Sequence, residues 1–293
     1  MGKAERSRNL ARRERIAAQQ AAAQRAERRR RMLIASGSVA VVLVLVVAIL
    51  VLKLSQAPAK AGPAASDPAL AGLVTDVPPA TFDTVGKGTS AGLQAISGQR
   101  LLTRDGRPEV LYLGAEYCPY CAAERWVLAA ALSRFGTFSS LHFIHSSPDD
   151  IYPSTPTLSF YRSTYASSYV DFEPVETEGP IEGQPLQTPS AAQAALMSAW
   201  DRPPYVQAGH NDSIPFVDIG GRYLLIGSQY VPSELAGLSW SQVAHDMHNP
   251  ASAVARDIDG AANIITAAIC KETAGQPGGV CTSAGITRAA GSL

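Results

Sequence analysis

Apolar runs of different lengths predict where the elements of this chain lie. The longest covers residues 32–52, about 21 residues without a charge, which at 1.5 Å per residue crosses a hydrocarbon core of about 30 Å. Short apolar runs at 110–113 and 141–144 have the length of buried strands. Residues 191–200 predict a short helix with Ser190 as its N-cap candidate, and amphipathic helical spacing follows at 239–248 and 253–269. The pattern predicts one membrane span and a mixed α/β body.

Two supersecondary units organise that body. The strand at 110–113 ends at Gly114, and strong helix formers continue to residue 132. With the strand at 141–144 they give the order strand, helix, strand, which predicts a βαβ unit with neighbouring parallel strands. Further on, 214–219 and 222–226 flank Gly220-Gly221 and predict a β-hairpin.

Two cysteines lie where the first strand hands over to the helix, in Cys118-Pro119-Tyr120-Cys121. A helix N-terminus favours the thiolate, and proline suits the first turn. Thiol exchange needs an exposed nucleophilic sulfur and a second thiol that resolves the mixed disulfide. We therefore expect Cys118 to attack and Cys121, one turn further in, to resolve. A redox-inactive structural disulfide and half of a zinc site are the alternatives.

The second cysteine pair bears on the zinc alternative. Cys270 and Cys281 have ten residues between them, without the tight ligand spacing of a zinc site, so we expect neither a metal nor a cofactor. A structural disulfide between them is the favoured interpretation, and a relay that passes electrons to Cys118 and Cys121 is the alternative. Four cysteines in two pairs are compatible with an oxidising compartment.

Charge is distributed unevenly, although the formal net charge is +0. Residues 1–31 contain eleven Lys and Arg against three Glu, and the remaining chain is acidic by the same amount. Because this basic segment abuts the apolar run, the positive-inside rule predicts a cytoplasmic N-terminus and a C-terminal domain outside the cytoplasm. A cleaved signal peptide near 57–59 is the alternative. Nucleic-acid binding is not expected.

The chain accordingly divides into five predicted parts. They are a basic cytoplasmic tail at 1–31, a transmembrane helix at 32–54, an Ala/Pro/Gly-rich linker at 55–80, a globular domain at 81–270 with an insertion at about 152–205, and a Gly/Ala-rich tail at 271–293.

Several local strings resemble the thioredoxin superfamily. Ala115-Glu116-Tyr117-Cys118 is similar to the lead-in of thioredoxins, Cys-Pro-Tyr-Cys is typical of glutaredoxins, and Ile214-Pro215 precedes the hairpin as the cis-proline of that superfamily does. The resemblance covers about residues 105–250 and implies a thioredoxin-like fold. With the anchor, the chain resembles an uncharacterised actinobacterial family of membrane-anchored thioredoxin-like proteins. A cis Ile214–Pro215 bond would present the Ile214 backbone to a substrate, with Pro119 and Tyr120 beside it.

Two departures from the superfamily matter. Tyr112 stands six positions before the first cysteine, where thioredoxins carry a buried acid, so proton removal from the second cysteine would need Glu116, Glu124 or water. The insertion is also longer than the thioredoxin connection and is similar in shape to those of secreted thiol oxidases.

The resemblance and the residues together favour a membrane-anchored, extracytoplasmic thiol–disulfide oxidoreductase. Its partners would be protein thiols or disulfides and an unidentified redox partner, with Cys118, Cys121 and Pro215 at the site. A redox-inactive thioredoxin-like binding or assembly module of the cell envelope is the principal alternative. A cytosolic glutaredoxin-like enzyme conflicts with the predicted orientation of the anchor.

Overall fold

A six-stranded mixed sheet forms the centre of the computed structural model, which describes residues 65–293. The strand β9 is parallel to β4, and the other pairings are antiparallel. In spatial order the strands are β2 (Gln94–Ala95), β11 (Tyr223–Ile226), β10 (Phe216–Ile219), β4 (Arg107–Gly114) and β3 (Thr103–Arg104), with β9 (Asp171–Glu176) also pairing with β4. The described part of the chain is therefore a mixed α/β fold, as its pattern predicts.

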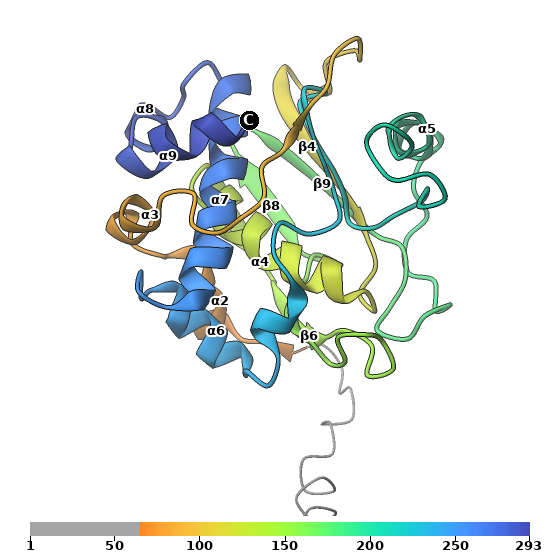
Figure 1. Cartoon of the computed structure of the whole chain (residues 1–293), viewed down its shortest axis with the longest axis horizontal. Helices are drawn as coiled ribbons and strands as arrows, with labels where there is room; N and C mark the ends of the chain where they lie inside the picture. Colours follow the sequence, from red (N-terminus) through yellow and green to blue (C-terminus); the bar gives the residue numbers. More distant parts are fainter. Residues whose placement is uncertain (1–64) are drawn as a thin grey trace, which may run out of the picture. The chain divides into compact units, whose positions relative to one another are not determined.

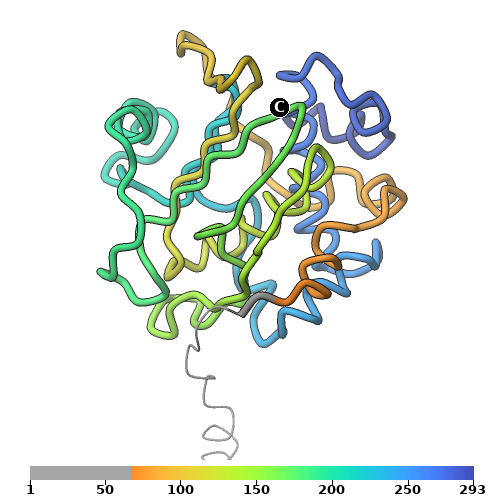
Figure 2. The backbone as a smooth tube through the Cα atoms, turned by 180° about the vertical axis from the view of Figure 1, so that it is seen from behind, coloured from red at the N-terminus to blue at the C-terminus, as the bar shows by residue number. Residues whose placement is uncertain are grey.

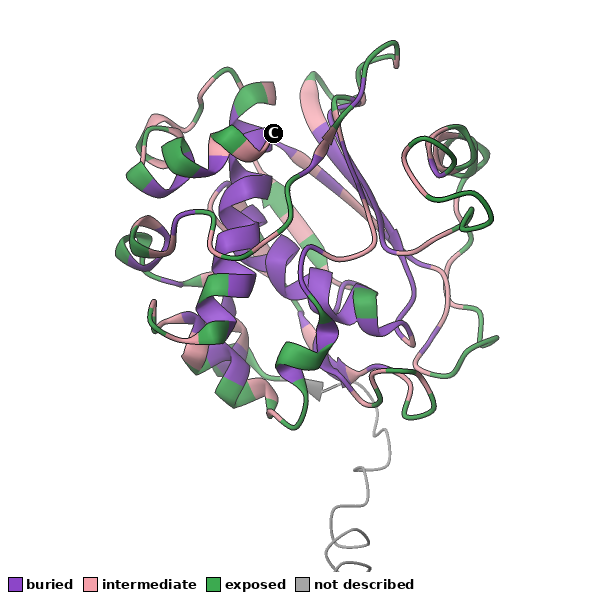
Figure 3. Ribbon diagram, in the orientation of Figure 1, coloured by how far each residue is buried: buried purple, intermediate pink, exposed green. Residues whose placement is uncertain are grey.

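Helices cover the two faces of this sheet unequally. On one side, α4 (Pro119–Leu132) packs against α7 (Ala253–Glu272), whereas α5 (Ala191–Trp200) lies on the other side (Figure 1). Nearly every residue of α4 is buried, and none of α5 is (Figure 3). Shorter helices surround α7, namely α3 (Pro79–Val85), α6 (Trp240–Met247), α8 (Gly278–Cys281) and α9 (Ala284–Ala289). Helix α2 (Pro68–Thr75) packs against α4 and α6. The core therefore lies mainly between the sheet and α7.

The predicted βαβ unit is wrong. The strand predicted at 141–144, which is β6 (His142–His145), lies in a separate antiparallel sheet with β1 (Ala65–Ser66) and β7 (Pro156–Ser159). The strand that directly follows α4, β5 (Gly136–Ser139), pairs with β8 (Thr164–Ser167). The chain reaches the parallel partner of β4 only at β9 (Figure 2). A four-residue apolar run shows that a strand is buried, but not which sheet it joins.

Other predicted elements are confirmed. The hairpin β10–β11 turns at Gly220 and Gly221, whose φ angles of 63° and 72° suit glycine. Ser190 and Ser239 form capping boxes that begin α5 and α6. Each serine side chain accepts a hydrogen bond from the backbone N–H of the glutamine three residues later, and that glutamine side chain accepts one from the serine backbone N–H.

Three predicted boundaries need correction. The linker does not extend to residue 80, because α2 buries Leu70 and Val74 and α3 begins at Pro79. The segment 271–293 folds into α8 and α9, with Ile286 buried. The insertion at 152–205 is not separate from the domain, because it contributes β9 to the central sheet. The predicted transmembrane helix at 32–54 lies outside the described residues; among residues 65–293 no helix is long and apolar enough to span a membrane.

Candidate functional site around Cys118 and Cys121

Both free cysteines lie at the end of β4, where α4 begins. Gly114 and Glu176 are opposite each other at the ends of β4 and β9. The loop that follows β4 is hydrogen-bonded to the two residues that follow β9. Thr177 N–H donates to Gly114 O at 2.7 Å, and Glu116 N–H donates to Glu178 O at 2.8 Å. The carboxyl ends of the two parallel strands thus fix the loop that leads to Cys118.

Cys118 is the N-cap residue of α4, and its Sγ accepts a hydrogen bond from the Cys121 amide at 3.4 Å. Both thiols are free; Cys118 is 6 % exposed and Cys121 is completely buried. A hydrogen bond from the Cys121 thiol lowers the pKa of Cys118, against the effect of burial, and the Arg125 guanidinium adds to the lowering. Burial raises the pKa of Cys121 well above its ordinary value. The pair therefore has the asymmetry expected of an attacking and a resolving thiol, although Cys118 is less exposed than we expected.

Residues from another part of the chain complete the surroundings of Cys118. The Ile214–Pro215 bond is cis, and the Cys118 thiol donates to Ile214 O at 3.7 Å. Pro119, the first residue of α4, is buried. Tyr120 is 37 % exposed and packs edge-on against Tyr152, with 5.7 Å between the ring centroids. The structure thus places the predicted backbone carbonyl of Ile214 beside the first sulfur.

A buried ion pair lies next to the cysteines, and our interpretation of the sequence missed it. Arg125 projects from α4 and donates from Nε and Nη2 to the two carboxylate oxygens of Glu176, both at 2.8 Å. The same Nη2 donates to Ala115 O at 2.6 Å. Both side chains are completely buried. The available signal was Arg125, which with Glu124 interrupts the otherwise apolar run from Ala122 to Leu132, because an unpaired charge is rarely buried there.

The two carboxylates predicted to handle protons lie in different surroundings. Glu116 accepts from the Ser159 hydroxyl, and burial raises its pKa. Glu124 is completely buried; the backbone N–H of Gln229 donates to its Oε2 at 3.2 Å, and burial raises its pKa to about 8. In the described part of the chain, neither carboxylate hydrogen-bonds to a cysteine. Their role in proton transfer stays a prediction.

The second pair of cysteines is bonded. Cys270, near the end of α7, and Cys281, in α8, form a disulfide with a Cα–Cα distance of 5.5 Å. The predicted pairing is confirmed. This bond joins α8 to α7 and so ties the C-terminal segment to the core.

Comparison with known proteins relates the chain to a described family. The family described as "Domain of unknown function (DUF929)" matches residues 94–199 and 201–271, more than half of the chain. The chain belongs to this family. The matched segments contain Cys118, Cys121, Glu176 and Pro215, so the whole candidate site lies within the family domain. No curated protein and no solved structure matches the chain.

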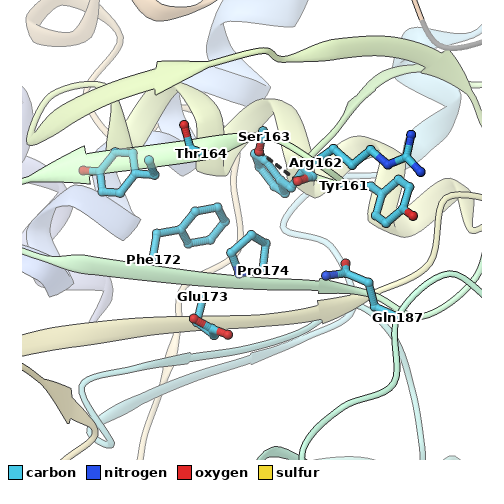
Figure 4. Close-up of a pocket in the computed structure, with 10 residues that line it drawn as sticks. Tyr161, Arg162, Ser163, Thr164, Phe172, Glu173, Pro174 and Gln187 are labelled. Atoms are coloured by element: carbon cyan, nitrogen blue, oxygen red, sulfur yellow. Dashed lines mark hydrogen bonds between the residues drawn. The ribbon is translucent and has the colours of Figure 1, made fainter.

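A cavity of about 380 Å³ lies between β8 and β9, away from the cysteines. Phe172 and Pro174 form one wall, and Tyr161, Arg162 and Gln187 lie at one end (Figure 4). None of the residues that line it belongs to the candidate site. Within residues 65–293, no group of three or more His, Cys, Asp or Glu residues is arranged to hold a metal ion.

Proposed function

We propose that this protein is a membrane-anchored, extracytoplasmic thiol–disulfide oxidoreductase. The observation that carries the proposal is the placement of two free thiols one helical turn apart at the N-terminus of α4, with the carbonyl of Ile214 3.7 Å from the first sulfur. A lowered pKa at Cys118 and a raised pKa at Cys121 give the two sulfurs different tasks.

The reaction needs no group beyond the two thiols and a disulfide substrate. The Cys118 thiolate attacks one sulfur of the substrate, a mixed disulfide forms, and the first substrate sulfur leaves as a thiolate. Cys121 then loses its proton and attacks Cys118 Sγ, so that a Cys118–Cys121 bond forms and the second substrate sulfur departs. The substrate gains two electrons, and the cysteine pair is oxidised. With a dithiol substrate and an oxidised pair, the same steps run in reverse.

Two broader features belong to the proposal. A thioredoxin-like fold agrees with the order of elements, since the Cys-x-x-Cys segment follows β4 and the cis-proline precedes β10, the antiparallel neighbour of β4. The location outside the cytoplasm rests on the apolar run at 32–52 behind a basic segment. The disulfide between Cys270 and Cys281 supports it, because such bonds persist in oxidising compartments.

The proposal is tested with the reduced full chain, purified in detergent, and a peptide that contains one disulfide. Mass spectrometry should find that the wild type releases both peptide thiols, whereas Cys121→Ser accumulates a mixed disulfide at position 118. Cys118→Ser should do neither. The proposal fails if the peptide disulfide leaves Cys118 unmodified, or if Cys118→Ser reduces it as fast as the wild type does.

The low exposure of Cys118, 6 %, favours a second candidate function. In a binding or assembly module of the cell envelope, the two cysteines would form a static bond, and exchange would be of no consequence. A reduction potential below about −300 mV marks structural disulfides and would favour this candidate.

A further inference from the structure

Two hydrogen-bond donors near Cys121 have no partner among the described residues. They are the phenol hydroxyl of Tyr112, on β4, and Nη1 of Arg125, on α4; both side chains are completely buried. A buried donor that lacks a partner destabilises the folded chain, because it has lost its hydrogen bond to water without replacement. Two such donors at one place need an explanation, and a charge that develops only during a reaction is one of the few available.

These donors and the Cys121 sulfur all lie beside the same short segment, Gly114 and Ala115. Arg125 Nη2 donates to Ala115 O at 2.6 Å, and the backbone amide of Ala115 lowers the pKa of Cys121. The phenol oxygen of Tyr112 lies so close to Gly114 that a Cβ at that position would overlap it. Glycine at 114 therefore leaves room for the hydroxyl beside the loop that contacts Cys121.

The titratable groups around the Cys121 sulfur indicate that the Tyr112 hydroxyl acts as a hydrogen-bond donor and not as a base. Burial raises the pKa of Tyr112 well above its ordinary value, so the phenol keeps its proton where a thiol titrates. Glu176 is fully engaged by Arg125. The titratable groups near Cys121 are Cys118 and Arg125 on α4, Tyr112 on β4, Tyr117 in the intervening loop, and Glu176 on β9 through its pair with Arg125.

We propose that Tyr112 stabilises the Cys121 thiolate, its hydroxyl donating a hydrogen bond to the sulfur during the resolving step. This inference rests on the proposed function. Cys121 gives up its proton to solvent, the thiolate attacks Cys118 Sγ, the bond between Cys118 and the substrate breaks, and the departing substrate thiolate takes a proton from solvent. The phenol donates throughout and is itself unchanged. It thus fills the position at which thioredoxins carry a buried acid, but with the opposite hydrogen-bonding role.

The test compares two buried tyrosines that lie beside α4. Tyr112→Phe removes the unpartnered hydroxyl, whereas Tyr230→Phe removes one that donates to Ala123 O at 3.0 Å. In the Cys118→Ser full chain, Cys121 is the remaining free thiol, and its pKa is followed through the carbon-13 chemical shift of its Cβ. Tyr112→Phe should raise this pKa by about one pH unit or more, a tenfold loss of thiolate at a given pH. Tyr230→Phe should lower the Tm and leave the pKa of Cys121 unchanged.

A second readout keeps the inference separate from the proposed function. With Cys118 present, Tyr112→Phe should slow resolution of the mixed disulfide about tenfold or more and leave its formation unchanged. Equal pKa values for Cys121 in the Tyr112→Phe and unsubstituted chains would overturn the inference, even if exchange occurs. If the chain does not exchange with the peptide but the pKa rises as expected, the contact between Tyr112 and the thiolate stands and the oxidoreductase proposal falls.

Discussion

Glu124 offers a sharp quantitative test of the structure, because it is a completely buried carboxyl that a conservative substitution can neutralise. Its Oε2 accepts a hydrogen bond from the backbone N–H of Gln229, and its Oε1 has no partner among the described residues. Burial raises the pKa of Glu124 to about 8 from its usual 4.5. The folded chain therefore holds this proton at pH values where the unfolded chain has lost it.

The difference between the two pKa values, about 3.5, corresponds to about 5 kcal/mol of unfolding free energy. The sign follows from the direction of the difference. This contribution is fully present below pH 4.5, declines as the pH rises, and is lost once the pH passes about 8. Between pH 6 and pH 8 the loss amounts to about 2 kcal/mol. Glu124→Gln keeps the acceptor for Gln229, cannot ionise, and should remove this dependence.

The measurement is chemical denaturation of the full chain at pH 6, 7, 8 and 9, with Cys118→Ser and Cys121→Ser present so that thiol ionisation does not contribute. The free energy of unfolding of Glu124→Gln should exceed that of its parent by an amount that grows with pH. Glu234→Gln, at an exposed position in the short 3-10 helix Pro232–Leu235 before α6, is the matched control and should leave the pH dependence as it is. Parallel curves for Glu124→Gln and its parent would refute the burial and the raised pKa assigned to Glu124.

Three further predictions concern stability. Replacing Cys270 and Cys281 together by serine should lower the free energy of unfolding by about 2–3 kcal/mol, measured by denaturation, and leave the reaction with a peptide disulfide unchanged. Ser190→Ala breaks the capping box of α5 and should cost about 1 kcal/mol by the same assay. Arg125→Met alone should cost about 3–5 kcal/mol, because it strands the charge of Glu176; adding Glu176→Gln should recover most of that loss, and failure to recover it would argue against the ion pair.

Local features of the fold could be predicted from the sequence because their signals lie within a few residues. The transition from β4 to α4 is marked in the sequence by an apolar run, a glycine and a series of helix formers. The β10–β11 hairpin is similar, since Gly220-Gly221 marks the turn between two apolar segments.

The pairing of strands far apart in the sequence could not be predicted in this way. Strand β9 is Asp-Phe-Glu-Pro-Val-Glu, half acidic and interrupted by Pro174, as suits the edge of a sheet but not a recognisable core strand. The apolar run at β6 looked like the better partner for β4, although it belongs to another sheet. Composition also gave a wrong prediction at α2. The Ala-, Pro- and Gly-rich segment was expected to be a linker, but it forms a helix that buries Leu70 and Val74 in the core.

The candidate site shows the same division. Cys118 and Cys121 could be found from spacing alone. The buried pair of Arg125 with Glu176 depends on a contact across 51 positions, which no local pattern contains. The position of Tyr112 was visible in the sequence, but the unpartnered state of its hydroxyl follows only from the packing around it.

The reduction potential of the Cys118–Cys121 pair tests the central claim most directly. It is measured on the full chain by equilibration with glutathione redox buffers, with the oxidised and reduced cysteine pairs separated by mass spectrometry. An exchanging pair should have a potential between about −120 and −270 mV, within the range of known thiol–disulfide oxidoreductases. A potential below about −300 mV would contradict the account, because the two cysteines would then form a structural bond that the cell does not cycle.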